Sequence, residues 1–404
     1  MIKDDKKITR VLFLLRSYND IDHIVPIIWK CRQCKVDCYY LLVESDHSRD
    51  YRIGFIRKSG AIRIHSKVMN YYHSYARHFL ISDNVKNIVD RLAGYMIGRP
   101  LLRKNKIEVV VTEWSGRSGR GKAKYILRPA FQLGLQVYSV PHGYNIYTNL
   151  DVSRTITNYR QRLGKWPDFS SRNAFTRYVV QHQSTKTFCE SYGIQATKLA
   201  VLGSTRFCRE WIDINEQISR PRLEDRLGVN LFKVVFFLPQ WDYNVDRAEC
   251  YRLIVQIGNI PEIFMRLKGS TRKIENPYDA EERHLIENKN IVFSNEETST
   301  ALIRWSDVVV NFASSIGLEA VMQNKVILNP TYLHSNSTIF DDSNVAINCD
   351  NPDLVQEYIL RIKSNQILTA DKKDQKAFYE KFIQGDTTDS DVLGKYVNLV
   401  KGGI

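Results

Sequence analysis

The sequence lacks any apolar run that approaches the ~18–20 residues needed to cross a lipid bilayer. Its first ten residues, "MIKDDKKITR", lead straight into a short segment expected to be a strand, without the apolar stretch of a secretory signal peptide. It has seven cysteines, an odd number, and their spacing shows no pattern of disulfide pairing, as expected for a protein of a reducing compartment. These absences predict a cytoplasmic protein.

Internal repeats at a fixed short period and low-complexity tracts are also missing. A chain of 404 residues is long for a single core, and 43% hydrophobic and 25% charged residues are typical of a globular protein. The sequence therefore predicts two domains of ordinary size.

Metal-ligand patterns are weak. Cys31, Cys34 and Cys38 have no second Cys/His pair nearby, so we interpret them as structural thiols, and Asp341-Asp342 is not a D-x-D motif. The sequence predicts no metal site.

Acidic residues are the minority, 44 against 58 basic ones, which gives a net charge of +14. Nine Lys/Arg against two acids lie between Arg99 and Arg128, an excess of seven and half of the net charge. This patch predicts an anionic partner, unless it is simply a solvated basic face. Only Trp114 and Tyr125 interleave with the cations as stacking aromatics, which disfavours nucleic acid.

Short apolar runs alternate with helical patterns through both halves of the chain, as in parallel sheets covered by helices. In the first half the predicted strands are 11–15, 38–43, 108–111, 136–140, 178–181 and 199–202. In the second half they are 234–238, 263–267, 291–293, 308–312 and 326–328.

The predicted boundaries follow from this alternation. We expect a Rossmann-like domain over 1–212, a polar linker over 213–230, a second Rossmann-like domain over 231–370, and C-terminal helices over 371–404 that pack back across the junction. Ligands of open α/β sheets bind at the carboxyl ends of the strands, so the two domains should face a shared cleft. Residues just after each strand are therefore the site candidates.

Two strand ends in the first domain carry such candidates. His142 follows the strand that ends at Val140 and can transfer a proton near neutral pH, or it is an ordinary turn histidine. Gly203 and Ser204 follow the strand that ends at Leu202 and suit an anion at a helix N-terminus, or an ordinary N-cap.

The second domain offers a base or nucleophile and a cation. Asp242 follows the first strand of this domain, although an aspartate before a helix is also a routine cap. Lys268 ends the next strand, where a cation facing the cleft suits a diphosphate leaving group.

The stretch "DVVVNFASSIGLEAVMQNKVIL" gives the most specific strand end. Ser314 and Ser315 open a helix whose free N–H groups suit an anion, Gly317 allows close approach, and Glu319 can bind a ribose. An N-cap pair is the structural alternative.

The loop "GRSGRGKA" at 116–123 has the G-x-x-x-x-G-K spacing of a nucleotide-phosphate loop. Ala123 stands where that motif needs a hydroxyl to hold Mg²⁺. We therefore do not expect an ATP site.

The 307–328 stretch resembles the donor-nucleotide segment of GT-B glycosyltransferases. Together with "GLQVYSVPHGYN", "QSTKTFCESYGIQATKLAVLGSTRF" and "EIFMRLKGS", the resemblance covers most of residues 107–330. It is nearest to bacterial surface-polysaccharide (capsule and O-antigen, lipopolysaccharide) transferases, which include the CMP-Kdo-dependent Kdo transferases and the glycerol-phosphate polymerases that use CDP-glycerol.

The sequence departs from the usual motifs of these enzymes at three places, and the departures narrow the choice of class within the family. Many retaining GT-B enzymes carry two glutamates eight positions apart, and Asn311 stands eight before Glu319. Gly269-Ser270 replaces the His-Pro of sialyl- and some Kdo-transferases, and the residues around His142 differ from those of the glycerol-phosphate polymerases. The resemblance that remains implies a retaining, metal-independent beta-Kdo transferase without a cofactor.

The resemblance assigns roles to the candidates. Asp242 would be the carboxylate nucleophile, with Glu113 and Asp151 as competitors, and His142 would lie near the reacting centre. The donor nucleotide would be held by Lys268, Ser314, Ser315, Gly317 and Glu319, with Gly203 and Ser204 nearby.

The acceptor would be a glycan on a lipid diphosphate. Arg117, Arg120 and Lys122 would engage that phosphate or the anionic inner face of the membrane. The chain itself is either complete or one module of a larger transferase.

Two other classes stay open. A UDP-sugar transferase or epimerase, or a CDP-glycerol-type phosphotransferase, fits the same fold, but an epimerase leaves the basic patch without a role. A nucleic-acid-binding protein is disfavoured by the few aromatic residues.

Overall fold

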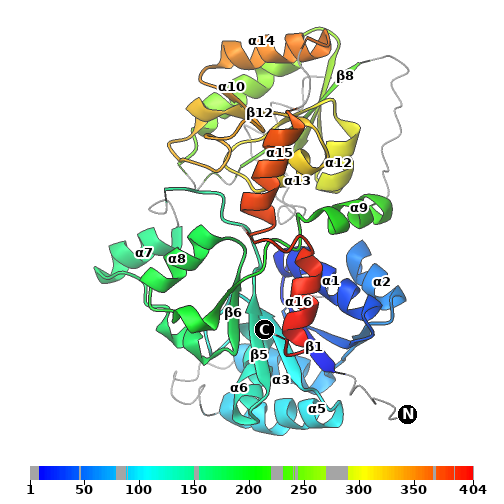
Figure 1. Ribbon diagram of the computed structural model, residues 1–404, viewed down its shortest axis with the longest axis vertical. Helices are drawn as coiled ribbons and strands as arrows, with labels where there is room; N and C mark the ends of the chain where they lie inside the picture. Colours follow the sequence, from blue (N-terminus) through cyan, green and yellow to red (C-terminus); the bar gives the residue numbers. More distant parts are fainter. Residues whose placement is uncertain are drawn as a thin grey trace. The chain divides into compact units, whose positions relative to one another are not determined.

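The computed structural model describes residues 9–44, 47–78, 88, 90–149, 154–219, 231–239, 241, 244–269, 290–366, 370–385 and 387–403 (Figure 1). The chain divides into two compact units, each built on one parallel sheet. The N-terminal unit comprises Met1–Tyr144, Pro167–Cys208 and Glu380–Ile404, and the second unit comprises Asn145–Trp166 and Arg209–Tyr379.

The sheet of the N-terminal unit has seven strands in the order β3-β2-β1-β4-β5-β6-β7, and every pairing is parallel. Its strands are β1 (Arg10–Leu15), β2 (Asp37–Leu42), β3 (Ile62–Arg63), β4 (Val109–Glu113), β5 (Gln136–Val140), β6 (Arg177–Val180) and β7 (Leu199–Val201). Its helices include α1 (Tyr18–Gln33), α2 (Tyr51–Lys58), α3 (Lys67–His78), the π-helix η1 (Gly94–Gly98), α5 (Arg99–Lys104), α6 (Lys124–Gln132), α8 (Gln183–Ser191) and α16 (Val392–Val400), with 3₁₀ turns η2 (Gly121–Ala123), η4 (Ser170–Ala174) and η5 (Ala196–Lys198).

The sheet of the second unit has six parallel strands in the order β10-β9-β8-β11-β12-β13. Its strands are β8 (Phe232–Phe237), β9 (Ile263–Lys268), β10 (Ile291–Phe293), β11 (Val308–Val310), β12 (Val326–Pro330) and β13 (Ile347–Cys349). Its helices include α7 (Arg154–Leu163), α9 (Arg209–Ile218), α10 (Arg247–Gly258), α12 (Ser299–Trp305), α13 (Ile316–Met322), α14 (Pro352–Lys363) and α15 (Lys372–Phe378), with the 3₁₀ turn η7 (Thr331–Leu333); the π-helix η8 (Tyr379–Ile383) follows α15.

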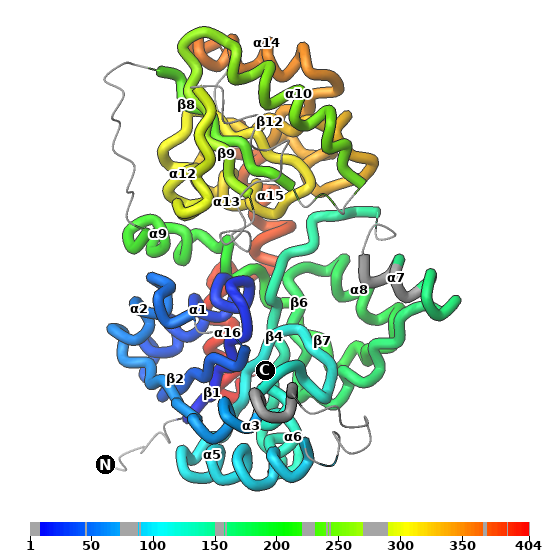
Figure 2. Tube along the Cα trace, turned by 180° about the vertical axis from the view of Figure 1, so that it is seen from behind, coloured from blue at the N-terminus to red at the C-terminus, as the bar shows by residue number. Residues whose placement is uncertain are grey.

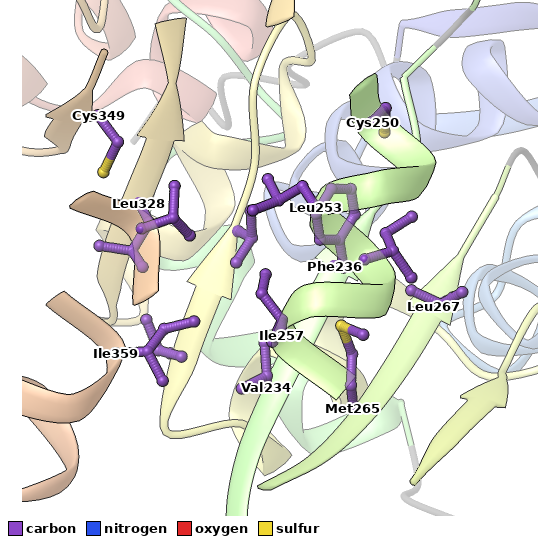
Figure 3. Close-up of a cluster of buried hydrophobic side chains, with 14 of the residues drawn as sticks. Val234, Phe236, Cys250, Leu253, Ile257, Met265, Leu267, Leu328, Cys349 and Ile359 are labelled. Carbon is purple, nitrogen blue, oxygen red and sulfur yellow. The ribbon is translucent and has the colours of Figure 1, made fainter. Parts of the chain in front are cut away.

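The central strands are almost purely apolar because helices cover both faces of each sheet. Every residue of β4 and β12 is buried, as are all but the first of β1. Figure 3 shows the core of the second unit, where Leu253 and Ile257 of α10 pack toward Phe236 of β8 and Met265 of β9. The expectation of two Rossmann-like parallel sheets is confirmed.

The units differ from the predicted boundaries at three places. Asp213–Ile218 is not a linker but part of α9, because Asn215 is buried and donates to Thr300 of α12 (2.7 Å); residues 220–230 lie outside the described part of the chain. Asn145–Trp166 belongs to the second unit, although it lies within the predicted first domain. The predicted C-terminal helices are split, since α15 belongs to the second unit and α16 to the N-terminal one.

Helix α16 packs against α1 in the N-terminal unit, and the two views agree on this pairing (Figures 1 and 2). Tyr396 is buried and its hydroxyl donates to the carbonyl oxygen of Gly203 (2.9 Å). Among the described residues, no helix is long and apolar enough to span a membrane.

Candidate functional site

Each sheet has a switch point, where the strand order reverses, and parallel sheets bind ligands at the carboxyl ends beside it. In the N-terminal unit the switch point lies between β1 and β4. Arg16 directly follows β1 and Glu113 ends β4, and the Arg16 guanidinium lies 3.4 Å from Oε1 of Glu113. His142 follows β5, the next strand, and its Nδ1 lies 3.1 Å from Oε2 of Glu113. The sequence prediction of Glu113 and His142 thus falls on two residues that the fold brings together.

The imidazole of His142 is oriented by its neighbours. Its Nδ1 is buried beside the carboxylate at ion-pair distance, although the angle is outside hydrogen-bond range, and the side chain is 32% exposed. The ring of Trp114 meets it edge-on at 5.9 Å, while the indole N–H donates to the carbonyl of Val179 (2.7 Å). A carboxylate at Nδ1 leaves Nε2 as the nitrogen that exchanges a proton with a ligand.

Asp20 adds a second buried carboxylate to this group. It lies in the first turn of α1, where it accepts from the Arg16 amide (2.7 Å) and from the Ser17 hydroxyl (3.2 Å). Burial, followed by the negative charge of Glu113, raises the pKa of Asp20 to about 6. The switch point of the N-terminal unit therefore holds two carboxylates, a guanidinium and an imidazole, a set suited to moving protons.

Gly203 and Ser204 follow β7, and the C-terminal segment of the same unit contacts both of them. The Ser204 amide donates to the carbonyl of Ile383 (2.8 Å), and the Ser204 side chain is fully buried. Gly203 has φ +85°, and a Cβ there would lie 2.6 Å from the Ile383 carbonyl oxygen. The amide that we expected to bind an anion thus holds the C-terminal segment in place.

The glycine-rich loop lies at the carboxyl end of β4, with Arg117 and Arg120 exposed and Lys122 half-buried. Lys122 donates to the Asn70 side chain (2.7 Å). The backbone of Gly121 is covered by an acid, because a Cβ there would lie 2.7 Å from a carboxyl oxygen of Glu44. The Glu44 carboxylate thus lies against the Gly121 backbone, which a nucleotide-phosphate loop would present to its phosphate.

Lys268 ends β9 in the second unit and is buried, with 3% of the residue exposed. Its ammonium group donates to the backbone carbonyl of Asn295 (3.0 Å), and the Asn295 side chain accepts from the amide of Gly269 (2.8 Å). Burial lowers the pKa of Lys268 to about 8, against the opposing effect of Glu297. A buried ammonium at a strand end is a candidate for an anionic ligand.

Ser314 and Ser315 lie between β11 and α13, as predicted. Ala313 before them has φ +49°, a strained conformation for a residue with a side chain. Asn311 is buried and donates to the Ser314 carbonyl (3.1 Å), while its own side-chain oxygen has no hydrogen-bond partner among the described residues. The serine hydroxyls therefore sit on a strained turn at the switch point between β8 and β11.

Gly317 and Glu319 have internal partners. A Cβ at Gly317 would lie 2.7 Å from both Asn311 and Phe340, so this glycine permits close packing inside the unit. Glu319 is buried and accepts from the Thr300 hydroxyl, which in turn accepts from the Asn215 amide (2.7 Å). These contacts join α13 to α12 and α9.

Two predicted carboxylates cannot be placed. Asp242 and Asp151 both lie outside the described residues. Among the residues that are described, no group of three or more His, Cys, Asp or Glu could hold a metal ion, and Cys31 and Cys38 are buried.

The sequence reasoning missed Arg16, Asp20 and Asn295. Arg16 directly follows a predicted strand, so the rule that selected the other candidates would have selected it too. Ser17 and Asp20 have the spacing of a helix cap, which gives a signal for Asp20. Asn295 is the second residue after the predicted strand 291–293, so the same rule could have selected it.

Comparison with known proteins gives a clear result only at the level of structure. No family model and no curated protein matches the sequence. A glycosyltransferase from Rickettsia africae ESF-5 superposes with a TM-score of 0.58 at 12% identity, covering 98% of both chains. The UDP-GlcNAc 2-epimerase of Methanocaldococcus jannaschii gives 0.60 at 13% identity, covering 98% of this chain and all of that one (100%).

A putative UDP-N-acetylglucosamine 2-epimerase from Listeria monocytogenes gives a TM-score of 0.62 at 9% identity, covering 98% of this chain and 96% of the other. Similarity at these identities establishes the fold and nothing finer. The chain therefore has a GT-B-type fold, as the sequence predicted.

Proposed function

We propose that this protein is a glycosyltransferase that transfers a sugar from a nucleotide-sugar donor to a glycan acceptor. The observation that carries the proposal is the pairing of Glu113 with His142, beside Arg16, at the switch point of a sheet in a GT-B-type fold. Both glycosyltransferases and UDP-GlcNAc epimerases are among the structures with similar folds.

His142 is the proposed general base. With Nδ1 turned to Glu113, Nε2 takes the proton of the acceptor hydroxyl while the hydroxyl oxygen forms a bond to the anomeric carbon. The bond between that carbon and the nucleotide phosphate breaks, and the phosphate leaves with the electron pair. Glu113 stabilises the imidazolium that forms, and Arg16 fixes the carboxylate.

This direct displacement inverts the anomeric configuration. The resemblance to beta-Kdo transferases instead implies double displacement with retention, through a carboxylate such as Asp242. The anomeric configuration of the product, determined by NMR and compared with that of the donor sugar, distinguishes the two mechanisms.

The proposed donor is a UDP-sugar. Several similar folds belong to proteins described as UDP-GlcNAc 2-epimerases, one of them in complex with UDP-GlcNAc and UDP. CMP-Kdo, implied by the sequence resemblance, is the second candidate. In either case Lys268, with Ser314 and Ser315, is proposed to hold the donor phosphate. Gly317 and Glu319 would support this turn from within the unit.

The proposed acceptor is a lipid-linked glycan of a bacterial surface polysaccharide, with Arg117, Arg120 and Lys122 near its phosphate. Arg117 and Arg120 are exposed at the carboxyl end of β4, on the same sheet edge as His142. Charge-assisted hydrogen bonds from arginine suit a diphosphate.

A UDP-sugar 2-epimerase is the second candidate function, because several of the similar folds carry that description. It differs from a transferase in needing no acceptor. Incubation with UDP-GlcNAc alone, followed by NMR of the sugar, therefore separates the two.

The deciding experiment is a thermal-shift titration with CMP, CDP, UMP, UDP and ATP, since a ligand that binds only the folded state raises its stability. UDP should stabilise most. Stabilisation by CMP above the others would transfer the proposal to CMP-Kdo, and no stabilisation by any nucleotide would refute a nucleotide-sugar enzyme.

A further inference from the structure

The helical stretch 90–104 of the N-terminal unit contains η1 and α5. Its Leu102 is buried, and Ile97 and Leu101 pack against the core, but three other large apolar side chains are exposed to solvent. Leu92 is 54% exposed, Tyr95 61% and Met96 71%, and Ile88 just before them is 56% exposed. Their spacing of three to four residues puts them along one side of the helix. An amphipathic helix of a water-soluble unit ordinarily buries such residues.

The small residues of this helix explain why Leu92, Tyr95 and Met96 are exposed. Ala93, Gly94 and Gly98 are buried, and they form the face that meets α6. A Cβ at Gly98 would lie 1.8 Å from the carbonyl oxygen of Tyr125, so the two backbones touch. The close approach of the small residues fixes the rotation of the helix and leaves Leu92, Tyr95 and Met96 on the outside.

Basic residues accompany this apolar face. Arg91, Arg103 and Lys104 are exposed on the same helical stretch, and the Arg99 guanidinium lies 5.4 Å from the centre of the Tyr95 ring. The one acid among residues 90–104 is Asp90, which is paired with Lys124 (2.6 Å). The surface therefore combines exposed apolar groups with positive charge that no acid within the described stretch 90–104 neutralises, since Asp90 is paired with Lys124.

We propose that this surface, defined by Leu92, Tyr95 and Met96 with Arg91, Arg99, Arg103 and Lys104, docks the protein on an anionic lipid bilayer. Apolar side chains enter the boundary between headgroups and acyl chains, a tyrosine suits the headgroup level, and basic residues bind anionic lipid. The positive charge argues against a second copy of the chain, because two such faces would repel each other. The net charge of +14 acts in the same direction.

The test is co-sedimentation of the full chain with large unilamellar vesicles of phosphatidylcholine, with and without phosphatidylglycerol. We expect binding to the anionic vesicles that weakens as salt is raised, and little binding to the neutral ones. The double variant Leu92→Gln/Met96→Gln keeps helix-compatible side chains and should lower the vesicle affinity about tenfold or more.

Leu360→Gln is the matched control, because Leu360 is a half-exposed leucine on helix α14 of the second unit. It should leave vesicle binding unchanged. A second variant, Arg103→Gln/Lys104→Gln, should flatten the salt dependence, and the melting temperatures of all variants should match that of the wild type.

Three outcomes would overturn the proposal: no binding of the wild type to anionic vesicles, unchanged binding of the Leu92→Gln/Met96→Gln variant, or a dimer in sedimentation that this variant dissolves. The dimer outcome would mean that a second copy of the chain, and not a membrane, binds this surface. None of them bears on nucleotide binding, so this inference and the proposed glycosyl transfer fail or hold separately.

Discussion

The Nδ1 atom of His142 and the Oε2 atom of Glu113 are 3.1 Å apart, at the ends of two adjacent parallel strands. The strand register places this pair: Glu113 lies beside Val140, two residues before His142. If the pair is the acid–base group, its removal must slow the chemical step while leaving nucleotide binding intact.

The His142→Asn variant should lower kcat for glycosyl transfer at least about 100-fold, because it loses the general base. Glu113→Gln should lower it to a similar degree, since the amide favours the wrong imidazole tautomer. Both should bind nucleotide like the wild type in a calorimetric titration. The control is His65→Asn, a substitution at an exposed histidine of the same unit; equal activity of His142→Asn and His65→Asn would refute the role.

Asp20 should make stability depend on pH. Its pKa is 3.8 in the unfolded reference and about 6 in the folded protein, so the folded state binds more protons between about pH 4 and 6. The free energy of unfolding should therefore fall as pH rises through this window, by an amount on the order of 3 kcal/mol. Urea titrations at several pH values should show a weaker dependence of the free energy of unfolding on pH for Asp20→Asn than for the wild type. An unchanged dependence would contradict a raised pKa of Asp20 in the folded protein.

Lys268 should make nucleotide affinity depend on pH, because its pKa is lowered to about 8. The ammonium loses its charge as pH rises through that value, so nucleotide binding should weaken between about pH 7 and 9. Lys268→Met should bind about tenfold more weakly at pH 7 and lose this dependence.

Lys325→Met is the control for this substitution. Lys325 is a half-buried lysine of the second unit whose pKa is also lowered by burial, but it precedes β12 and lies at the amino end of that strand. It should leave affinity unchanged in isothermal titration. If both variants lost the same amount of nucleotide affinity, Lys268 would affect binding only through the stability of the second unit and not through contact with the phosphate.

Gly203→Ala should destabilise the protein far more than a left-handed backbone alone explains. Gly134 has φ +68° with no atom within 4 Å of an added Cβ, so Gly134→Ala measures the backbone cost, about 1–2 kcal/mol. At Gly203 the added Cβ also meets the Ile383 carbonyl oxygen at 2.6 Å, which should add about 1–3 kcal/mol. Chemical denaturation of the two variants checks this, and equal losses would contradict the tight packing at Gly203.

Much of the fold was predictable because both sheets are parallel and covered. Continuous apolar runs such as "VLFLL" and "VVVNF" mark the central strands, and each predicted strand agrees with the observed one to within two residues at both ends. Strands β3 and β13 were missed, since they are two and three residues long and only partly buried. The strand-end rule selected His142 and Lys268, and the resemblance selected Glu113; the structure places all three at carboxyl ends of strands, while their roles stay predictions.

What the sequence could not give depends on contacts between distant segments. Nothing near Ser204 indicates that Ile383 takes its amide, and nothing near Glu319 indicates that Thr300 bonds its carboxylate. The predicted anion site at Gly203 and Ser204 and the predicted ribose contact of Glu319 were each drawn from one segment. The boundary errors at 145–166 and after Glu380 have the same cause.

The C-terminal segment Glu380–Ile404 belongs to the N-terminal unit, and this sets the order in which the two units can be completed during synthesis. All seven strands of the first sheet have been made once Val201 is synthesised, yet α16, which packs on α1 and bonds Gly203 through Tyr396, follows nearly two hundred residues later. On the ribosome, the second unit is therefore complete before the first one is. Until then the buried face of α1 that meets α16 stays uncovered, and a nascent chain stalled before Val392 is expected to be a substrate for chaperones.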